Sequence, residues 1–136
     1  MIVKAEAKNV RLSPEKVRLV VAQIKKMSPQ KAVTMLGFVN KSSSPVLKKV
    51  INSAIANAKN NFGLDEQTLA FKEFSVGKGP MSKRYRPVSR GRAHAILKRT
   101  SHIKVILEGE PKKNETNKSD KTNLTNSKEA KNGTKS

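Results

Sequence analysis

The segment Phe74–Leu107 constrains the fold of this chain most, because it concentrates positive charge without any compensating acid. It carries nine lysines and arginines, and no acidic residue lies between Glu73 and Glu108. Five of the seven arginines fall within Arg84–Arg99, although lysine outnumbers arginine 22 to 7 overall. A guanidinium binds phosphate bidentately and stacks on bases, which an ammonium cannot do. A charge run is usually a solvated face. Here the missing acids, the choice of arginine and Tyr85 among the cations indicate a nucleic-acid contact surface.

Both sides of this segment have the alternating pattern of a strand. Leu69–Val76 is the first, and its apolar positions change parity between Phe71 and Phe74, which predicts a β-bulge. Alternation returns at Ala95–Leu107. One face of this second strand should carry Leu97, Ile103, Val105 and Leu107.

Glycine and proline interrupt the pattern between these strands, and predict a tip without a regular ladder between Pro80 and Arg92. Gly77, Gly79, Pro80, Pro87 and Gly91 are the interrupting residues. The two strands therefore form a long hairpin, residues 74–107, whose tip reaches roughly 30 Å from its base. An isolated two-stranded ribbon is marginal in water, so this arm should be ordered by what it touches.

The chain before the arm predicts one strand and three helices. Ile2–Val10 alternates, with Val3, Ala5 and Ala7 on one face. Each of three Ser-Pro pairs predicts a helix start, because serine caps a helix and proline suits its first position. The pairs are Ser13-Pro14, Ser28-Pro29 and Ser44-Pro45, and the helices are expected over Pro14–Lys26, Pro29–Leu36 and Pro45–Phe62. Gly37 and Gly63 are the expected stops of the second and third helices.

Apolar residues recur at helical spacing on all three helices, and these stripes are most simply core. They are Val17, Val20, Val21 and Ile24; Ala32, Val33 and Leu36; and Leu47, Val50, Ile51, Ala54, Ile55 and Ala58. Small residues at Ala54, Ala56 and Ala58 would let the third helix approach the sheet closely. The predicted fold is α+β, a three-stranded antiparallel sheet packed against three helices, with a protruding β-hairpin arm.

Two regions are expected: a nucleic-acid-binding α+β domain over residues 1–109, which includes the hairpin, and a tail over 110–136. The tail consists mainly of Lys, Asn, Thr, Ser and Glu, and has too few apolar residues to offset the entropy of ordering. We therefore expect it to be disordered.

Composition favours a polyanionic partner and excludes several classes of protein. The net charge is +19 and the pI about 10.5, which suits a nucleic acid. No long apolar run, lipidation signal or secretory signal is present, so we expect a cytoplasmic protein that does not associate with a membrane. No cysteine is available for disulfides or thiolate metal sites. The sequence shows no self-complementary apolar face, so we do not expect a homo-oligomer.

Catalytic chemistry has no visible basis in the sequence. His94 and His102 lack a third metal-ligand type nearby, and the few acidic residues form no obvious pair. The Gly77-Lys78-Gly79 segment lacks the Gly-Lys-Ser/Thr ending of a P-loop. We expect no enzyme activity, no metal and no cofactor.

Several motifs in the same order resemble the bacterial type of large-subunit ribosomal protein twenty-two. They are RLSPEKVRLV at Arg11–Val20, SAIANAKNN at Ser53–Asn61, and GPMSKRYRP with GRAHAILKRTSHI within Gly79–Ile103. The resemblance covers roughly residues 2–108. It implies a structural rRNA-binding protein that supports assembly of the large ribosomal subunit, with a hairpin reaching the nascent-chain exit tunnel. Large-subunit rRNA, neighbouring ribosomal proteins and the nascent polypeptide are the implied partners. The order Met81-Ser82 departs from the Ser-Met expected for the family.

The charge pattern and the resemblance together define two candidate sets. The RNA-binding set is Lys78, Lys83, Arg84, Tyr85, Arg86, Arg90, Arg92, Lys98, Arg99, Thr100, Ser101, His102, Arg11 and Arg18. By the resemblance, the tunnel-lining tip is Gly79, Pro80, Met81, Ser82, Lys83, Arg84, Tyr85, Arg86, Pro87, Val88, Ser89, Arg90 and Gly91. The alternative function is a free-standing basic β-ribbon protein that binds and shapes DNA or RNA.

Overall fold

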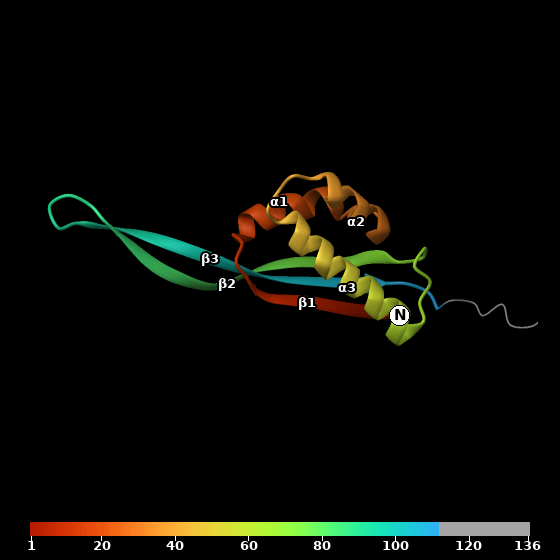
Figure 1. Cartoon of the computed structure of the whole chain (residues 1–136). Coiled ribbons are helices and arrows are strands. Elements are labelled where there is room, and N and C mark those ends of the chain that lie inside the picture. The colour runs from red at the N-terminus through yellow and green to blue at the C-terminus, as the bar shows by residue number, and fades with distance from the viewer. Residues whose placement is uncertain (112–136) are drawn as a thin grey trace, which may run out of the picture.

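The computed structural model describes residues 1–111 and has six elements in a single α+β arrangement. They are β1 (Ile2–Val10), α1 (Pro14–Ile24), α2 (Pro29–Phe38), α3 (Ser44–Phe62), β2 (Ala70–Pro87) and β3 (Ala93–Glu108). The strands form one antiparallel sheet in the order β1-β3-β2, and the helices cover one of its faces (Figure 1). The predicted fold class is confirmed.

The core lies between the sheet and the helices, and the period of two in the strands decides which residues enter it. On β3, Ile103, Val105 and Leu107 are fully buried, whereas the residues between them are not. On β1, Val3 and Ala5 are buried in the same way. Alternation in the sequence therefore predicted the inward face of both strands.

The helices bury the stripes predicted from their 3.6-residue period. The fully or nearly buried helix residues include Val17, Val20, Val21, Ile24, Ala32, Leu36, Leu47, Val50, Ile51, Ala54 and Ala58. Ala54 and Ala58 are completely buried in α3, so small side chains do lie in the core, but Ala56 is exposed and plays no part in it.

Helix ends differ from the prediction in detail. The first helix ends at Ile24 rather than Lys26, and the third begins at Ser44, which makes Ser43 its cap. The second helix passes through Gly37 to Phe38, so Gly37 is not its stop. Gly63 ends α3 in the left-handed conformation, as predicted (φ 57°). None of the capping serines makes a side-chain hydrogen bond to its helix, so their side chains do not supply the expected cap.

The second strand continues much further than the sequence predicted. A register shift lies between Phe71 and Glu73, which confirms the predicted bulge, and another lies between Lys78 and Met81. Beyond it the ladder runs from Met81↔Arg99 to Pro87↔Ala93, so the expectation of a broken ladder is wrong. Because β2 is an edge strand, a proline without an N–H donor is tolerated there.

The distal part of this hairpin projects as a twisted ribbon beyond the body of sheet and helices (Figure 1). Every residue from Pro80 to Arg99 is exposed. We restrict the name arm to this exposed segment, residues 80–99, which is shorter than the hairpin arm over residues 74–107 predicted from the sequence. Its turn is only Val88–Arg92, so most of the predicted tip is strand.

The end of the described chain attaches to the turn between α3 and β2. The Asp65 N–H donates to Glu110 O, the Glu110 N–H donates to Thr68 Oγ1, and Pro111 forms a bridge with Leu64. Glu110 and Pro111, which we placed in the tail, therefore contact the domain. The rest of the predicted disordered tail, residues 112–136, lies outside the described residues.

Candidate nucleic-acid interface

The arm carries its cations without acidic partners. Lys83, Arg84 and Arg86 lie on β2, Lys98 and Arg99 on β3, and Arg90 and Arg92 in the turn. Within residues 1–111, the ion pairs are Lys4–Glu6, Lys59–Glu66 and Lys72–Glu108, all on the body. The arm's positive charges are therefore available to an external anion.

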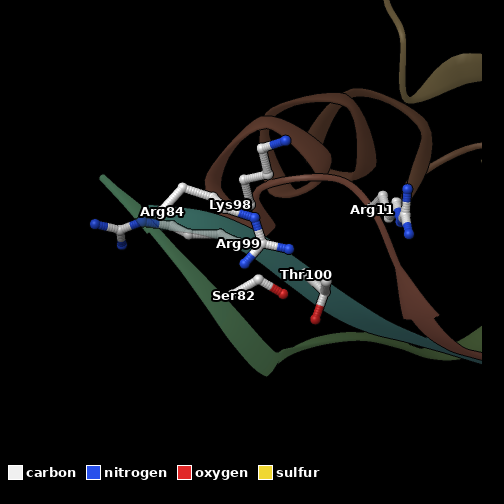
Figure 2. A pocket seen from close by; sticks show the side chains of 6 residues that line it. All are labelled: Arg11, Ser82, Arg84, Lys98, Arg99 and Thr100. Carbon is white, nitrogen blue, oxygen red and sulfur yellow. The ribbon is translucent and has the colours of Figure 1, made fainter. Parts of the chain in front are cut away.

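A cleft at the root of the arm brings cations from three segments together. Arg11, from the β1–α1 connection, lines one side of an open volume of about 390 Å³, and residues of both arm strands line the other (Figure 2). The lining residues are Arg11, Ser82, Arg84, Lys98, Arg99 and Thr100. The guanidinium groups, the Lys98 ammonium and the Ser82 hydroxyl are donors that suit the oxygens of a phosphate. Sequence reasoning placed Ser82 only in the tip, because its position opposite Lys98 depends on the strand register.

The bulge at the root of the arm explains why residue 79 is a glycine. Thr100 Oγ1 donates a hydrogen bond of 2.7 Å to Pro80 O across the irregular step between Lys78 and Met81. A Cβ on Gly79 would overlap Thr100 Oγ1 and lie 3.2 Å from the Thr100 carbonyl carbon. The close contact between Gly79 and Thr100 thus helps to form the root of the arm. Thr100 also lines the cleft.

Two predicted RNA-binding residues hold the body to the base of the hairpin. Arg18 donates from Nε and Nη2 to Val76 O, at 3.3 and 2.8 Å, which ties α1 to β2. His102 Nδ1 accepts from the Asn9 N–H at 3.1 Å, where Asn9 adopts φ 55° at the register shift of β1. Asparagine tolerates that conformation better than most residues. Both side chains have a structural contact that the sequence pattern did not reveal.

Ser101 does not belong on the surface to which we assigned it. Ser101 is fully buried, and its Oγ has no hydrogen-bond partner among the described residues. It has the same parity on β3 as Ile103 and Val105, so it faces the core. Leu97 has that parity too, but it is 43% exposed because the helices do not extend over the arm.

The turn of the arm has a compact, partly strained backbone. The Val88 N–H donates to Arg92 O at 2.8 Å, and Arg90 and Gly91 adopt φ of 60° and 69°. Glycine does so freely, whereas arginine pays a steric penalty of about 1–2 kcal/mol. The structure thereby places Arg90 and Arg92 at the far end of the molecule from the core.

The remaining electrostatics of the described residues are simple. The hydrogen bond from Lys4 holds the pKa of Glu6 below its ordinary value, and the charges of Lys4, Lys8 and Lys104 act in the same direction. Residues 1–111 contain no group of three or more His, Cys, Asp or Glu side chains that could hold a metal ion. Among the same residues, no helix combines the length and hydropathy that crossing a bilayer requires.

Comparison with known proteins identifies the family of this chain. The family model described as "Ribosomal protein L22p/L17e" matches residues 5–108. The "Large ribosomal subunit protein uL22" of Staphylococcus aureus strains JH9 and Newman is 45% identical over 107 residues, which cover 79% of this chain and 92% of the relative. The family is structural and non-enzymatic, which confirms the expectation of no enzyme activity. Bacterial ribosomes are cytoplasmic, which confirms the expected localisation. From its motifs, its fold and these matches, the chain belongs to the ribosomal protein L22p/L17e family.

Proposed function

We propose that the protein is a constituent of the large ribosomal subunit that binds large-subunit rRNA through the arm and the root cleft. Its relatives are named as large-subunit proteins, which supports the placement. The observation that carries the RNA proposal is a projecting, exposed arm whose cations have no acidic partner among residues 1–111. An unpaired row of lysines and arginines on a ribbon matches the closely spaced phosphates of folded RNA.

The proposed RNA-contact residues differ from the sequence-based set by the side chains with internal roles. Lys78, Tyr85 and the arm cations remain, together with Arg11 at the cleft, whereas Thr100 donates its hydroxyl proton to Pro80 O. Arg18 and His102 act through the contacts that attach the body to the hairpin, and Ser101 is left out because it is buried.

The turn of the arm is the proposed element of the nascent-peptide exit tunnel. The support is the family membership together with the position of Val88–Arg92, which is the part of the molecule furthest along the ribbon from the body (Figure 1). The segment 79–87, which the sequence analysis included in the tip, would then approach the tunnel along the rRNA rather than line its narrowest part. Neighbouring large-subunit proteins and the nascent chain are the other proposed partners.

Sedimentation of cell extracts tests the proposed function directly. The tagged full-length chain should co-sediment with large subunits in low-magnesium sucrose gradients and should remain there after DNase treatment. A chain that followed the nucleoid, or stayed at the top of the gradient while other large-subunit proteins sedimented, would contradict the proposal. The first of these outcomes would support the free-standing architectural protein instead.

A further inference from the structure

The strand register divides the side chains of the arm between two chemically different faces. Pairing is regular outside the bulge, with Met81 opposite Arg99, Lys83 opposite Leu97 and Tyr85 opposite Ala95. Directly opposed residues of an antiparallel pair share a face, and successive residues alternate between faces. The odd-numbered and even-numbered residues of both strands therefore form separate surfaces.

One surface combines mostly apolar groups with two cations, and the other carries three cations with a serine, a histidine and the exposed Ile96. The apolar face consists of Met81, Lys83, Tyr85, Pro87, Ala93, Ala95, Leu97 and Arg99. The cationic face consists of Ser82, Arg84, Arg86, His94, Ile96 and Lys98. The single tyrosine of the chain lies on the apolar face.

The large side chains of the apolar face are exposed, and within residues 1–111 no helix covers them. Met81 is 55% exposed, Tyr85 69% and Leu97 43%, because the helices cover only the body. Isolated exposed apolar residues are ordinary, but several on one face of a ribbon indicate a surface that a partner covers. The diagonal neighbours on that face, about 7–8 Å apart, are within reach of aromatic and long side chains.

The charges around this face indicate what covers it. Lys83 and Arg99 lie on the same face, Arg84 and Lys98 lie directly behind it, and no acidic residue lies between Glu73 and Glu108. A partner that touches the apolar side chains must therefore place negative charge within a few ångströms of them. A single-stranded RNA segment does this, because its unstacked bases project from a chain of phosphates.

We propose that Tyr85, supported by Met81 and Leu97, is a stacking platform for unpaired RNA bases, while the cationic face holds phosphates. This rests on the proposed function of RNA binding and assigns separate roles to the two faces. Bases stack on an aromatic ring regardless of sequence, and phosphate contacts set the salt dependence. The platform accounts for the one tyrosine of the chain, which the counting of cations leaves unexplained.

Binding of the full-length chain to a large-subunit rRNA transcript, measured over a series of salt concentrations, separates the two roles. Tyr85→Ala should weaken binding roughly 5- to 100-fold at every salt concentration and leave the slope of log K against log salt unchanged. Tyr85→Phe keeps the ring and should bind like the unmodified chain. Arg84→Gln, from the opposite face, is the matched control and should reduce the slope by about 1.

Tyrosine fluorescence provides a second readout, because Tyr85 is the only tyrosine and the chain has no tryptophan. Stacking predicts quenching of that emission when the transcript is added, after correction for RNA absorbance, with Tyr85→Phe as the blank. Equal affinities for Tyr85→Ala and the unmodified chain, or unquenched emission in the complex, would overturn the platform while leaving RNA binding intact. If the unmodified chain fails to bind the transcript, both the platform and the proposed function are wrong.

Discussion

The close approach of Gly79 to Thr100 shows how a single residue decides where the arm begins. The sequence identified Gly79 and Pro80 as interruptions, but it gave no reason to place Thr100 against them, because the two segments are about twenty residues apart. In the fold, Thr100 donates to Pro80 O across the bulge, and only the absence of a Cβ on Gly79 leaves room for it. Ser101 shows the same limit, because polarity and resemblance suggested a surface residue where β3 parity buries it.

Replacement of Gly79 by alanine should loosen the root of the arm. The added Cβ overlaps Thr100 Oγ1, so the hydrogen bond to Pro80 O is lost, at a cost of about 1 kcal/mol. Amide hydrogen exchange should accelerate in the arm and remain unchanged in the helices. Gly77→Ala is the matched control, since its Cβ would lie 3.8 Å from His102 Cβ, an ordinary contact. Equal exchange in the two variants would show that the close approach does not hold the arm.

Exchange of the arm's arginines for lysines should separate charge from geometry. The variant replaces Arg84, Arg86, Arg90, Arg92 and Arg99 with lysine. Its charge is unchanged, so the salt dependence of rRNA binding should persist, whereas stacking and bidentate pairing are lost, on the order of 1–3 kcal/mol where each occurs. Titrations at matched salt measure the difference. Equal affinity would mean that the arginines act only as point charges.

At the scale of the elements, the hairpin and its first bulge were predictable, whereas its continuous ladder was not. Alternation and a parity change near Phe71 are written in the sequence, and both appear in the register. Pro80 and Pro87 suggested a break, because proline removes a ladder donor. Strand order decides whether that donor was needed, and on the edge strand β2 a missing outward donor costs no ladder bond.

Deletion of Met81–Arg84 should spare the body and alter the arm. The four residues are ladder residues rather than loop, so the deletion removes the pairings from Met81↔Arg99 to Arg84↔Ile96 and displaces the turn. None of them is buried, so the core of the body is untouched and the helices should keep their protection from hydrogen exchange. Ribosomes should contain the variant in stoichiometric amount, while arrest at a tunnel-sensitive peptide, or the response to small molecules lodged in the tunnel, should change.

Quantification of the protein in purified large subunits, beside an arrest assay, checks this prediction. Normal arrest together with a normal drug response would contradict the tunnel role. Failure of the deleted chain to enter subunits would show instead that the ladder segment is an assembly anchor.

At the scale of the whole molecule, the chain divides its tasks between a body that folds by burial and an arm that buries nothing within residues 1–111. The body's core was predictable because periods of 2 and 3.6 mark the buried residues directly, from Val3 on β1 to Ala58 on α3. The candidate site was predictable as a stretch of charge. Its arrangement was not, since the root cleft joins Arg11 to Arg99 through strand pairing, and Arg18 proves to be a tie between α1 and β2.

Removal of residues 112–136 should leave the stability of the domain unchanged, whereas removal of residues 110–136 should not. Glu110 exchanges hydrogen bonds with Asp65 and Thr68, and Pro111 bridges Leu64. The longer truncation should therefore cost about 1–2 kcal/mol, which thermal unfolding of the two proteins can measure. Equal destabilisation by both truncations would mean that the segment beyond Pro111 packs on the body.

The salt dependence of rRNA binding tests the central claim, that most RNA contacts lie on the arm rather than on the lysine-rich body. The unmodified chain is compared with a variant in which the seven arm cations are replaced by glutamine: Lys83, Arg84, Arg86, Arg90, Arg92, Lys98 and Arg99. Each lost phosphate contact reduces the magnitude of the negative slope of log K against log salt by about 0.7–0.9. The plot should therefore become less steep by up to about 6, and the affinity should be lost almost entirely. An unchanged slope with the large-subunit transcript would place the RNA contacts on the body and contradict this account.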